Sequence, residues 1–415
     1  DVCSSDLTAA AEAMALLYDV RSRDQKKNNV CKLFVSDDIL PQTLSVLQTR
    51  STPIGVELVI GNHETFDFSS DFFGAILQYP GKFGQVNDYS DFIATASENE
   101  IKVAVAADIL SLVKLKPPGE MGASVVLGTT QRFGIPLGYG GPHAAYFATK
   151  DEFKRGMPGR LIGVSVDAQG NRALRMALQT REQHIKREKA TSNICTAQAL
   201  LANMAVMYTI YHGPVGLKKI AEKIHGLAQN LEAQLTSLGI SQSNKYYFDT
   251  LHFSGFDIPA LQKEALAVNL NFRYFNDEKN NNSISITIDE TISVREIEKV
   301  VGLFEKVTGK KASGKASGAA SIPSSLVRTS TYLQHPVFNT HHSETQMMRY
   351  IKQLENKDLS LNTSMISLGS CTMKLNAATE MMPVSWAAFG ALHPFVPANQ
   401  TEGYQQILKE LSHYL

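Results

Sequence analysis

A glycine-dense stretch between two apolar segments constrains the fold of this chain more than any other feature of its sequence. It covers residues 128–143 and holds five glycines. The apolar segments on either side, residues 123–127 and 144–148, are typical of buried strands. Glycine permits φ values and close contacts that a Cβ forbids. Several glycines between two strands therefore indicate a bound cofactor or a closely packed neighbouring subunit.

The composition limits the size of the fold and the kinds of partner. The chain has 415 residues, of which 43% are hydrophobic, enough for two or three buried cores. Its 40 basic residues balance its 40 acidic residues, so we expect no nucleic acid and no anionic membrane as the principal partner. No apolar stretch is long enough to span a bilayer. These features favour small molecules or other proteins as partners.

The cysteines indicate the redox compartment of the protein, and the first residue bears on whether the sequence is a fragment. The four cysteines include no Cys-x-x-Cys pair, which argues against a disulfide scaffold or a zinc knuckle and suits a reducing compartment. The sequence begins at Asp1 instead of methionine, so a signal or transit peptide would not be visible. We expect the chain to be an internal fragment of a longer protein.

Apolar segments alternate with helical or loop segments through the first part of the chain. Residues 8–18 are alanine-rich and predict a helix. The segments that predict strands are residues 32–35, 55–60, 75–78, 103–106 and 123–127. Buried strands that alternate with helices are typical of a mostly parallel sheet covered on both faces. The predicted fold class is therefore α/β.

The later part predicts a smaller α+β unit, a linker and a third region. Helices are expected over residues 196–211, 215–238 and 294–307, with strands over residues 250–253, 271–274 and 283–288. Gly, Ala, Ser and Lys dominate between residues 309 and 325, which predicts a flexible linker. The predicted division is a large unit over residues 1–212, a small unit over 213–308, a linker over 309–325 and a third region over 326–415.

Five segments together resemble one known family. They are residues 8–14 (Thr-Ala-Ala-Ala-Glu-Ala-Met), 128–143, 187–196, 335–344 and 367–376. In this order they resemble glycine decarboxylase, the pyridoxal-phosphate subunit of the glycine cleavage system. The combination of Ser-Cys-Thr-Met-Lys at residues 370–374 with His-His-Ser-Glu at residues 341–344 is the most specific part of the likeness. Residues 1–7 do not resemble the family.

The resemblance implies a particular fold and cofactor. Each of two related halves would have the aspartate-aminotransferase-like fold, fold type I of the pyridoxal-phosphate enzymes, and only the second half supplies the Schiff-base lysine. The glycine-dense stretch is where that lysine would lie, but Gln131 and Arg132 stand there and neither forms an imine. We expect no catalytic residue in this chain, the lysine beyond Leu415, and pyridoxal 5'-phosphate bound by the second half, whose N-terminal part would be residues 326–415.

The activity implied is that of glycine dehydrogenase (aminomethyl-transferring, decarboxylating), an oxidoreductase of glycine catabolism. The implied partners are glycine, the lipoyl-bearing carrier protein, the second half of the enzyme and a second copy in a homodimer. The implied location is the cytoplasm in a bacterium and the mitochondrial matrix in a eukaryote. The chain alone is expected to be inactive. Two alternatives stay open, a non-catalytic structural or regulatory half and a pyridoxal-phosphate decarboxylase of another specificity.

Two segments supply the candidate residues for lining the active site. The candidates are Asn339, His341, His342, Ser370, Cys371, Thr372 and Lys374. The resemblance favours the first three as groups that reach a carboxylate or the cofactor, and a purely structural role stays open for them. The other four offer hydroxyls, a thiol and a cation to a small carboxylate substrate. Adjacent histidines point in different directions, so no metal site is expected.

Two further residues have more than one interpretation. Asp108 follows a predicted strand, at the place where a working enzyme of this kind pairs an aspartate with the cofactor's ring nitrogen. Because the lysine is absent, we interpret Asp108 as a turn residue or a remnant. Thr8 precedes the alanine-rich helix and suits either a plain helix cap or a contact to a phosphate.

Overall fold

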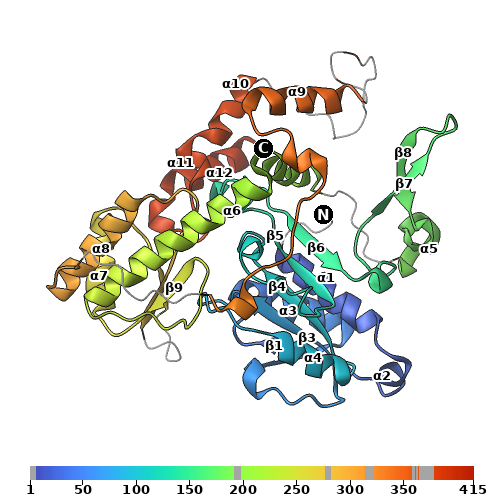
Figure 1. The fold of residues 1–415 in the computed structure, drawn as a ribbon, viewed down its shortest axis with the longest axis horizontal. Helices are drawn as coiled ribbons and strands as arrows, with labels where there is room; N and C mark the ends of the chain where they lie inside the picture. Colours follow the sequence, from blue (N-terminus) through green and yellow to red (C-terminus); the bar gives the residue numbers. More distant parts are fainter. Residues whose placement is uncertain are drawn as a thin grey trace.

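The main element of the fold is a six-stranded sheet (Figure 1). A computed structural model of the chain describes residues 6–190, 198–275, 282–313, 322–357, 360, 363 and 378–415. The strands are β1 (Lys32–Ser36), β2 (Glu57–Gly61), β3 (Phe72–Tyr79), β4 (Lys102–Ala107), β5 (Val125–Thr129) and β6 (Ala145–Thr149). Their order is β2-β1-β3-β4-β5-β6, with β1 to β5 parallel and β6 antiparallel to β5. The predicted α/β class is confirmed.

Both faces of the central strands of the sheet are buried, because successive side chains of these strands enter different cores. Leu33 and Val35 pack in one core with α1 and α3, whereas Phe34, between them, packs in the other core with α4. The covering helices are α1 (Asp6–Asp19), α3 (Pro41–Ser51) and α4 (Ser90–Glu98). Burial on both faces explains why these strands are continuous apolar segments in the sequence. The short helix α2 (Arg23–Lys27) leads from α1 toward β1.

The smaller unit combines an antiparallel sheet with helices. Its elements are β9 (Thr250–Phe253), α7 (Ile258–Ala267), β10 (Arg273–Phe275), β11 (Ser283–Thr287) and α8 (Val294–Thr308), and the strand order is β10-β11-β9. α8 begins with a capping box between Ser293 and Glu296 and ends at Gly309 in the left-handed region. The predicted strands and the predicted last helix of this unit are all present.

A long helix, α6 (Ala199–Ser237), connects the two units (Figure 1). Two separate helices were predicted here, over residues 196–211 and 215–238. The structure joins them across a kink at Gly213, whose φ is 61°, and Pro214, which lacks the N–H that an unbroken helix needs. The sequence therefore predicted the position of the interruption correctly, but the helix kinks at this point instead of ending in a loop.

Prediction from sequence missed a two-stranded antiparallel ribbon formed by β7 (Leu161–Val166) and β8 (Arg172–Ala177). The ribbon projects away from the rest of the chain (Figure 1). Ile162, Val164 and Leu174 lie on one face and are 63%, 64% and 70% exposed. The signal in the sequence was the alternation of small or polar with larger apolar residues on both sides of a turn that contains Gly170.

The remaining helices are short or amphipathic. They are α5 (Gln183–Lys186), α9 (Glu344–Glu355), α10 (Ala378–Met381), α11 (Ala387–Gly390) and α12 (Glu402–Tyr414). Within the described part of the predicted linker, Lys310 Nζ donates to the Leu238 carbonyl at 2.9 Å, so this end of the segment is anchored. The four-part division of the chain stays a prediction. No helix among the described residues is long and apolar enough to cross a membrane.

Candidate functional site

Asp108 lies at the carboxyl edge of the sheet, directly after β4, where ligands bind in many α/β folds. Its Oδ1 accepts a hydrogen bond from the Leu110 backbone N–H at 3.2 Å, and its Oδ2 accepts one from the Ser111 N–H at 3.2 Å. Ser111 Oγ in turn donates to the Asp108 carbonyl at 2.8 Å. Asp108 is thus a turn residue, as one of the two interpretations from sequence had it.

Asp108 also has a charged partner that the sequence did not indicate. Arg132, in the turn after β5, places Nη1 3.1 Å from Asp108 Oδ2 and 2.6 Å from Asp249 Oδ2. The side chains of Arg132, Asp108 and Asp249 are 19%, 21% and 7% exposed. Asp249 immediately precedes β9 of the smaller unit. One guanidinium therefore links the carboxyl edge of the large sheet to the small unit.

The charges in this cluster are coupled by their burial. Burial raises the pKa of Asp108, and the neighbouring Asp249 adds to that effect, whereas Arg132 opposes it. Burial lowers the pKa of Arg132, but the two carboxylates outweigh burial and raise it above its ordinary value. Arg132 is thus a permanent cation between two acidic side chains. Because one cation faces two buried carboxyl groups, the cluster favours a proton on one of these carboxyl groups.

The residues in this turn do not fit a pyridoxal cofactor. Such a cofactor needs a lysine to form its imine and an acidic partner for its ring nitrogen. The position expected for the lysine is Gln131, whose backbone N–H donates to Thr129 Oγ1 at 3.0 Å and tightens the turn. The acidic partner, Asp108, is already paired with Arg132. Neither requirement is met at this place.

The glycine-dense stretch contacts a later segment of the same chain. The backbone N–H of Tyr139 donates to the Leu392 carbonyl at 2.8 Å. The ring of Tyr139 lies 4.9 Å from the ring of Tyr404, and Gln405 Nε2 donates to the Tyr139 hydroxyl at 3.2 Å. The packed neighbour seen here is a segment of the same chain, α12 with the residues before it, which neither of the two explanations drawn from the sequence, a bound cofactor or a neighbouring subunit, had named.

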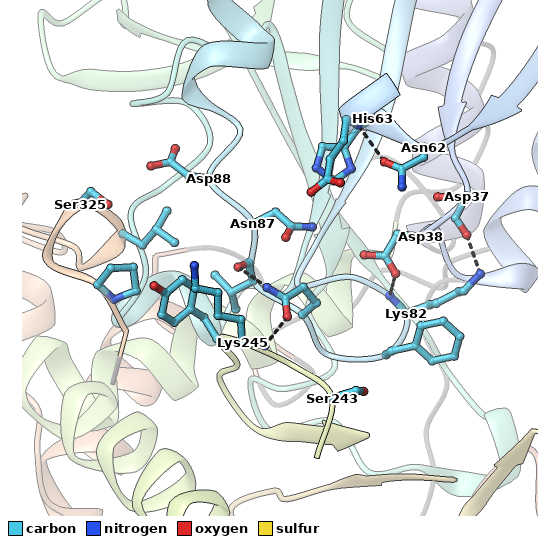
Figure 2. A pocket seen from close by; sticks show the side chains of 17 residues that line it. Asp37, Asp38, Asn62, His63, Lys82, Asn87, Asp88, Ser243, Lys245 and Ser325 are labelled. Carbon is cyan, nitrogen blue, oxygen red and sulfur yellow. Dashed lines mark hydrogen bonds between the residues drawn. The ribbon is translucent and has the colours of Figure 1, made fainter. Parts of the chain in front are cut away.

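A second polar cluster lines a cavity of about 680 Å³ (Figure 2). Its polar side chains include Asp37, Asp38, Asn62, His63, Lys82, Asp88, Ser243, Lys245 and Ser325. Figure 2 shows Asp37, Asp38 and Lys82 together on one side, with Asp88 and Ser325 across the cavity. The residues come from the ends of β1 and β2, from the segment between β3 and α4, from the small unit and from the end of the predicted linker.

Burial shifts the pKa of two side chains in this cavity, Asp38 and His63. Burial raises the pKa of Asp38 to about 6, although the cation of Lys82 opposes the shift. The backbone N–H of Lys82 donates to Asp38 Oδ1 at 3.1 Å. Burial lowers the pKa of His63. No sequence pattern assigned a role to Asp38 or His63, and the signal that could have found them is that each follows a predicted strand closely.

Three of the predicted site residues lie together near the kink of α6 and make structural contacts. Asn339 Nδ2 donates to the Leu333 carbonyl at 3.1 Å, and the ring of His341 stacks on that of Tyr350 at 4.2 Å. His342 Nδ1 lies 2.8 Å from the Tyr211 carbonyl, which only accepts, so this nitrogen carries the proton. Of these contacts, that of His342 joins the loop to α6 just before its kink, and none of the three side chains lines the cavity of Figure 2 or pairs with Asp108.

The other four predicted site residues, Ser370, Cys371, Thr372 and Lys374, lie outside the described residues. Their role in lining the substrate site stays a prediction. Within the described ranges, no three His, Cys, Asp or Glu side chains form a group that would hold a metal ion.

Comparison with known proteins connects this geometry to a family. The family model for the glycine cleavage system P-protein matches residues 4–304. Glycine dehydrogenase (decarboxylating) from Flavobacterium johnsoniae is 65% identical over 410 residues, which cover 98% of this chain and 43% of that protein. The protein of the same name from Christiangramia forsetii is 58% identical over the same shares. The chain thus spans less than half the length of these relatives.

A solved structure agrees with the sequence comparison. The crystal structure of glycine decarboxylase (P-protein) of the glycine cleavage system, in inhibitor-bound form, matches with a TM-score of 0.66 and 28% identity. The match covers 74% of this chain and 70% of that chain. It confirms the fold expected from the resemblance, that of the fold type I enzymes. This chain belongs to the glycine cleavage system P-protein family.

Proposed function

We propose that this chain is the first half of an enzyme that decarboxylates glycine and transfers the remaining aminomethyl group to the lipoyl arm of a carrier protein. The observation that carries the proposal is the 65% identity to glycine dehydrogenase (decarboxylating) across 98% of this chain. That relative is more than twice as long, since this chain covers 43% of it. The chemistry that this chain lacks is therefore assigned to sequence outside it.

The cofactor and the partners belong to the same proposal. Pyridoxal 5'-phosphate would supply the electron sink for decarboxylation and would be held by the second half of the enzyme. This chain would contribute walls of the active-site cleft, with Asn339, His341, His342 and the segment 370–374 as candidate lining residues. The further partners are a lipoyl-bearing carrier protein and a second copy in a homodimer. The similarity to a Flavobacterium enzyme favours the bacterial cytoplasm as the location.

The test measures release of labelled carbon dioxide from carboxyl-labelled glycine in the presence of pyridoxal phosphate and a lipoylated carrier protein. The chain alone should release none, because Gln131 stands at the lysine position and Arg132 pairs with Asp108. Adding the remaining part of the Flavobacterium johnsoniae relative as a separate polypeptide should produce release, and that polypeptide alone is the control. Decarboxylation by this chain alone, or no gain on mixing a folded pair, contradicts the proposal.

A further inference from the structure

The cluster of Arg132, Asp108 and Asp249 has no part in the proposed reaction, yet it joins the two units of the chain. Asp108 belongs to the large sheet, and Asp249 begins the small unit at β9. Arg132 Nη1 contacts both carboxylates, at 3.1 Å and 2.6 Å. Its Nε and Nη2 are buried and have no hydrogen-bond partner among the described residues. A buried guanidinium with two unpaired donors costs stability unless its ion pairs offset that cost.

The position of Arg132 decides what else fits beside Asp108. A pyridine-type ring nitrogen binds through a hydrogen bond to a carboxylate, and Asp108 Oδ2 already accepts from Arg132. We propose that Arg132 occupies the cofactor position of this half with its own side chain and, in place of a cofactor, fixes the small unit to the large sheet by an ion pair on each side. Arg132 is then a positioning residue, and the absence of lysine is only part of the reason that this half binds no pyridoxal.

The charge balance gives this proposal a specific consequence. Arg132 supplies one positive charge to two buried carboxylates. The other titratable groups that face this cluster are Tyr146, Tyr208, His225 and Glu290. Tyrosine and glutamate carry no positive charge, so His225 is the one of these four side chains that could replace the cation of Arg132. Burial lowers the pKa of His225, which disfavours its positive charge. Removal of the guanidinium therefore leaves two like charges buried at the junction of the units.

The first experiment compares Arg132→Met with Arg50→Met in this chain. Arg50 pairs with Glu12 at 3.0 Å but lies wholly within the large unit and is half exposed. Arg132→Met should lower the melting temperature at pH 8 by roughly 5 to 10 °C, whereas Arg50→Met should change it by about 2 °C or less. Without the cation the folded-state pKa of Asp108 rises further. The folded variant then holds a proton that the unfolded chain releases. The loss of melting temperature caused by Arg132→Met should therefore be smaller at pH 5.5 than at pH 8.

A second variant separates charge from packing. Asp249→Asn removes the surplus carboxylate, so the double variant Arg132→Met/Asp249→Asn should melt higher at pH 8 than Arg132→Met alone. If Arg132 acted through packing alone, the losses of melting temperature caused by the two substitutions would add, and neither loss would depend on pH. That result overturns the proposal. If Arg132→Met does not fold, Asp249→Asn alone still tests it, because that variant should flatten the pH dependence of the melting temperature relative to the unsubstituted chain.

The part of the proposal that concerns the cofactor is tested with pyridoxal phosphate itself. Added to the unsubstituted chain, it should not raise the melting temperature, and borohydride reduction should leave no stoichiometric adduct on a single lysine. Binding of one pyridoxal phosphate per chain that is lost in Asp108→Asn would show that Asp108 is available to a ring nitrogen and would overturn the proposal. These readouts do not use glycine, so they are independent of the proposed activity.

Discussion

Gly128, at the end of β5, shows how strictly one residue in the glycine-dense stretch is determined. A Cβ at this position would lie 2.1 Å from the Ala107 carbonyl oxygen and 2.8 Å from a ring carbon of Tyr146. The Tyr146 hydroxyl donates to the same carbonyl at 2.8 Å, so neither group is free to move away. Gly128 is needed because β4, β5 and β6 approach closely here, directly before the turn that holds Arg132.

Gly128→Ala should therefore destabilise the chain by roughly 3 kcal/mol, through overpacking against backbone. The matched control is Gly226→Ala, at an exposed position of α6 where a Cβ meets no atom within 4 Å. That change should stabilise the chain by about 0.5 to 1 kcal/mol, because alanine is the better helix former. Denaturant unfolding of both variants measures the two effects, and equal effects of the same sign would contradict this account of Gly128.

The β7–β8 ribbon projects from the rest of the chain (Figure 1). Its two strands form a sheet with no other strand of the described residues, and one of its faces presents Ile162, Val164 and Leu174 to solvent. An isolated two-stranded ribbon is marginally stable in water. β3, in contrast, is hydrogen-bonded on both sides and buried along almost its whole length.

The backbone amides of β7 and β8 should accordingly exchange with solvent at least roughly tenfold faster than those of β3 and β4. Hydrogen exchange followed by mass spectrometry of peptic peptides measures both regions in one experiment, so the central strands are an internal control. Protection of the ribbon equal to that of β3 would mean that another surface covers it. Protection that appears only at high protein concentration would identify that surface as a second copy.

For the molecule as a whole, apolar side chains are exposed on more than one element. The ribbon contributes one set, and α12 exposes Ile407, Leu408 and Leu411 along one side. Apolar surface gathered in this way favours association in water. We expect the average mass of the chain in light scattering to rise with concentration. Val164→Thr with Leu174→Thr should reduce that rise, whereas Ser165→Thr, on the other face of the ribbon, should not; a monomer at all concentrations would contradict this expectation.

The sequence by itself determined the α/β class, the positions of the central strands and the family. Strands buried on both faces are continuous apolar segments, and the family segments are short enough to be identified as local patterns. It also located the break in α6, since Gly213 and Pro214 act on their own backbone. In each case the physical cause lies within a few residues of its effect.

Only the tertiary structure decided the partners of Arg132 and the lining of the cavity. Arg132 and Asp249 are 117 residues apart, and no local pattern indicates that β9 brings them together. Lys82, Lys245 and Ser325 likewise share one cavity only because the small unit and the end of the predicted linker pack beside β1 and β2. The contact of His342 Nδ1 with the Tyr211 carbonyl of α6 is likewise a tertiary contact, whereas a role of Asn339, His341 and His342 in lining the substrate site stays a prediction. Which side chains pair across the fold depends on how the units pack, and the periodicity of residues along the chain does not indicate this packing.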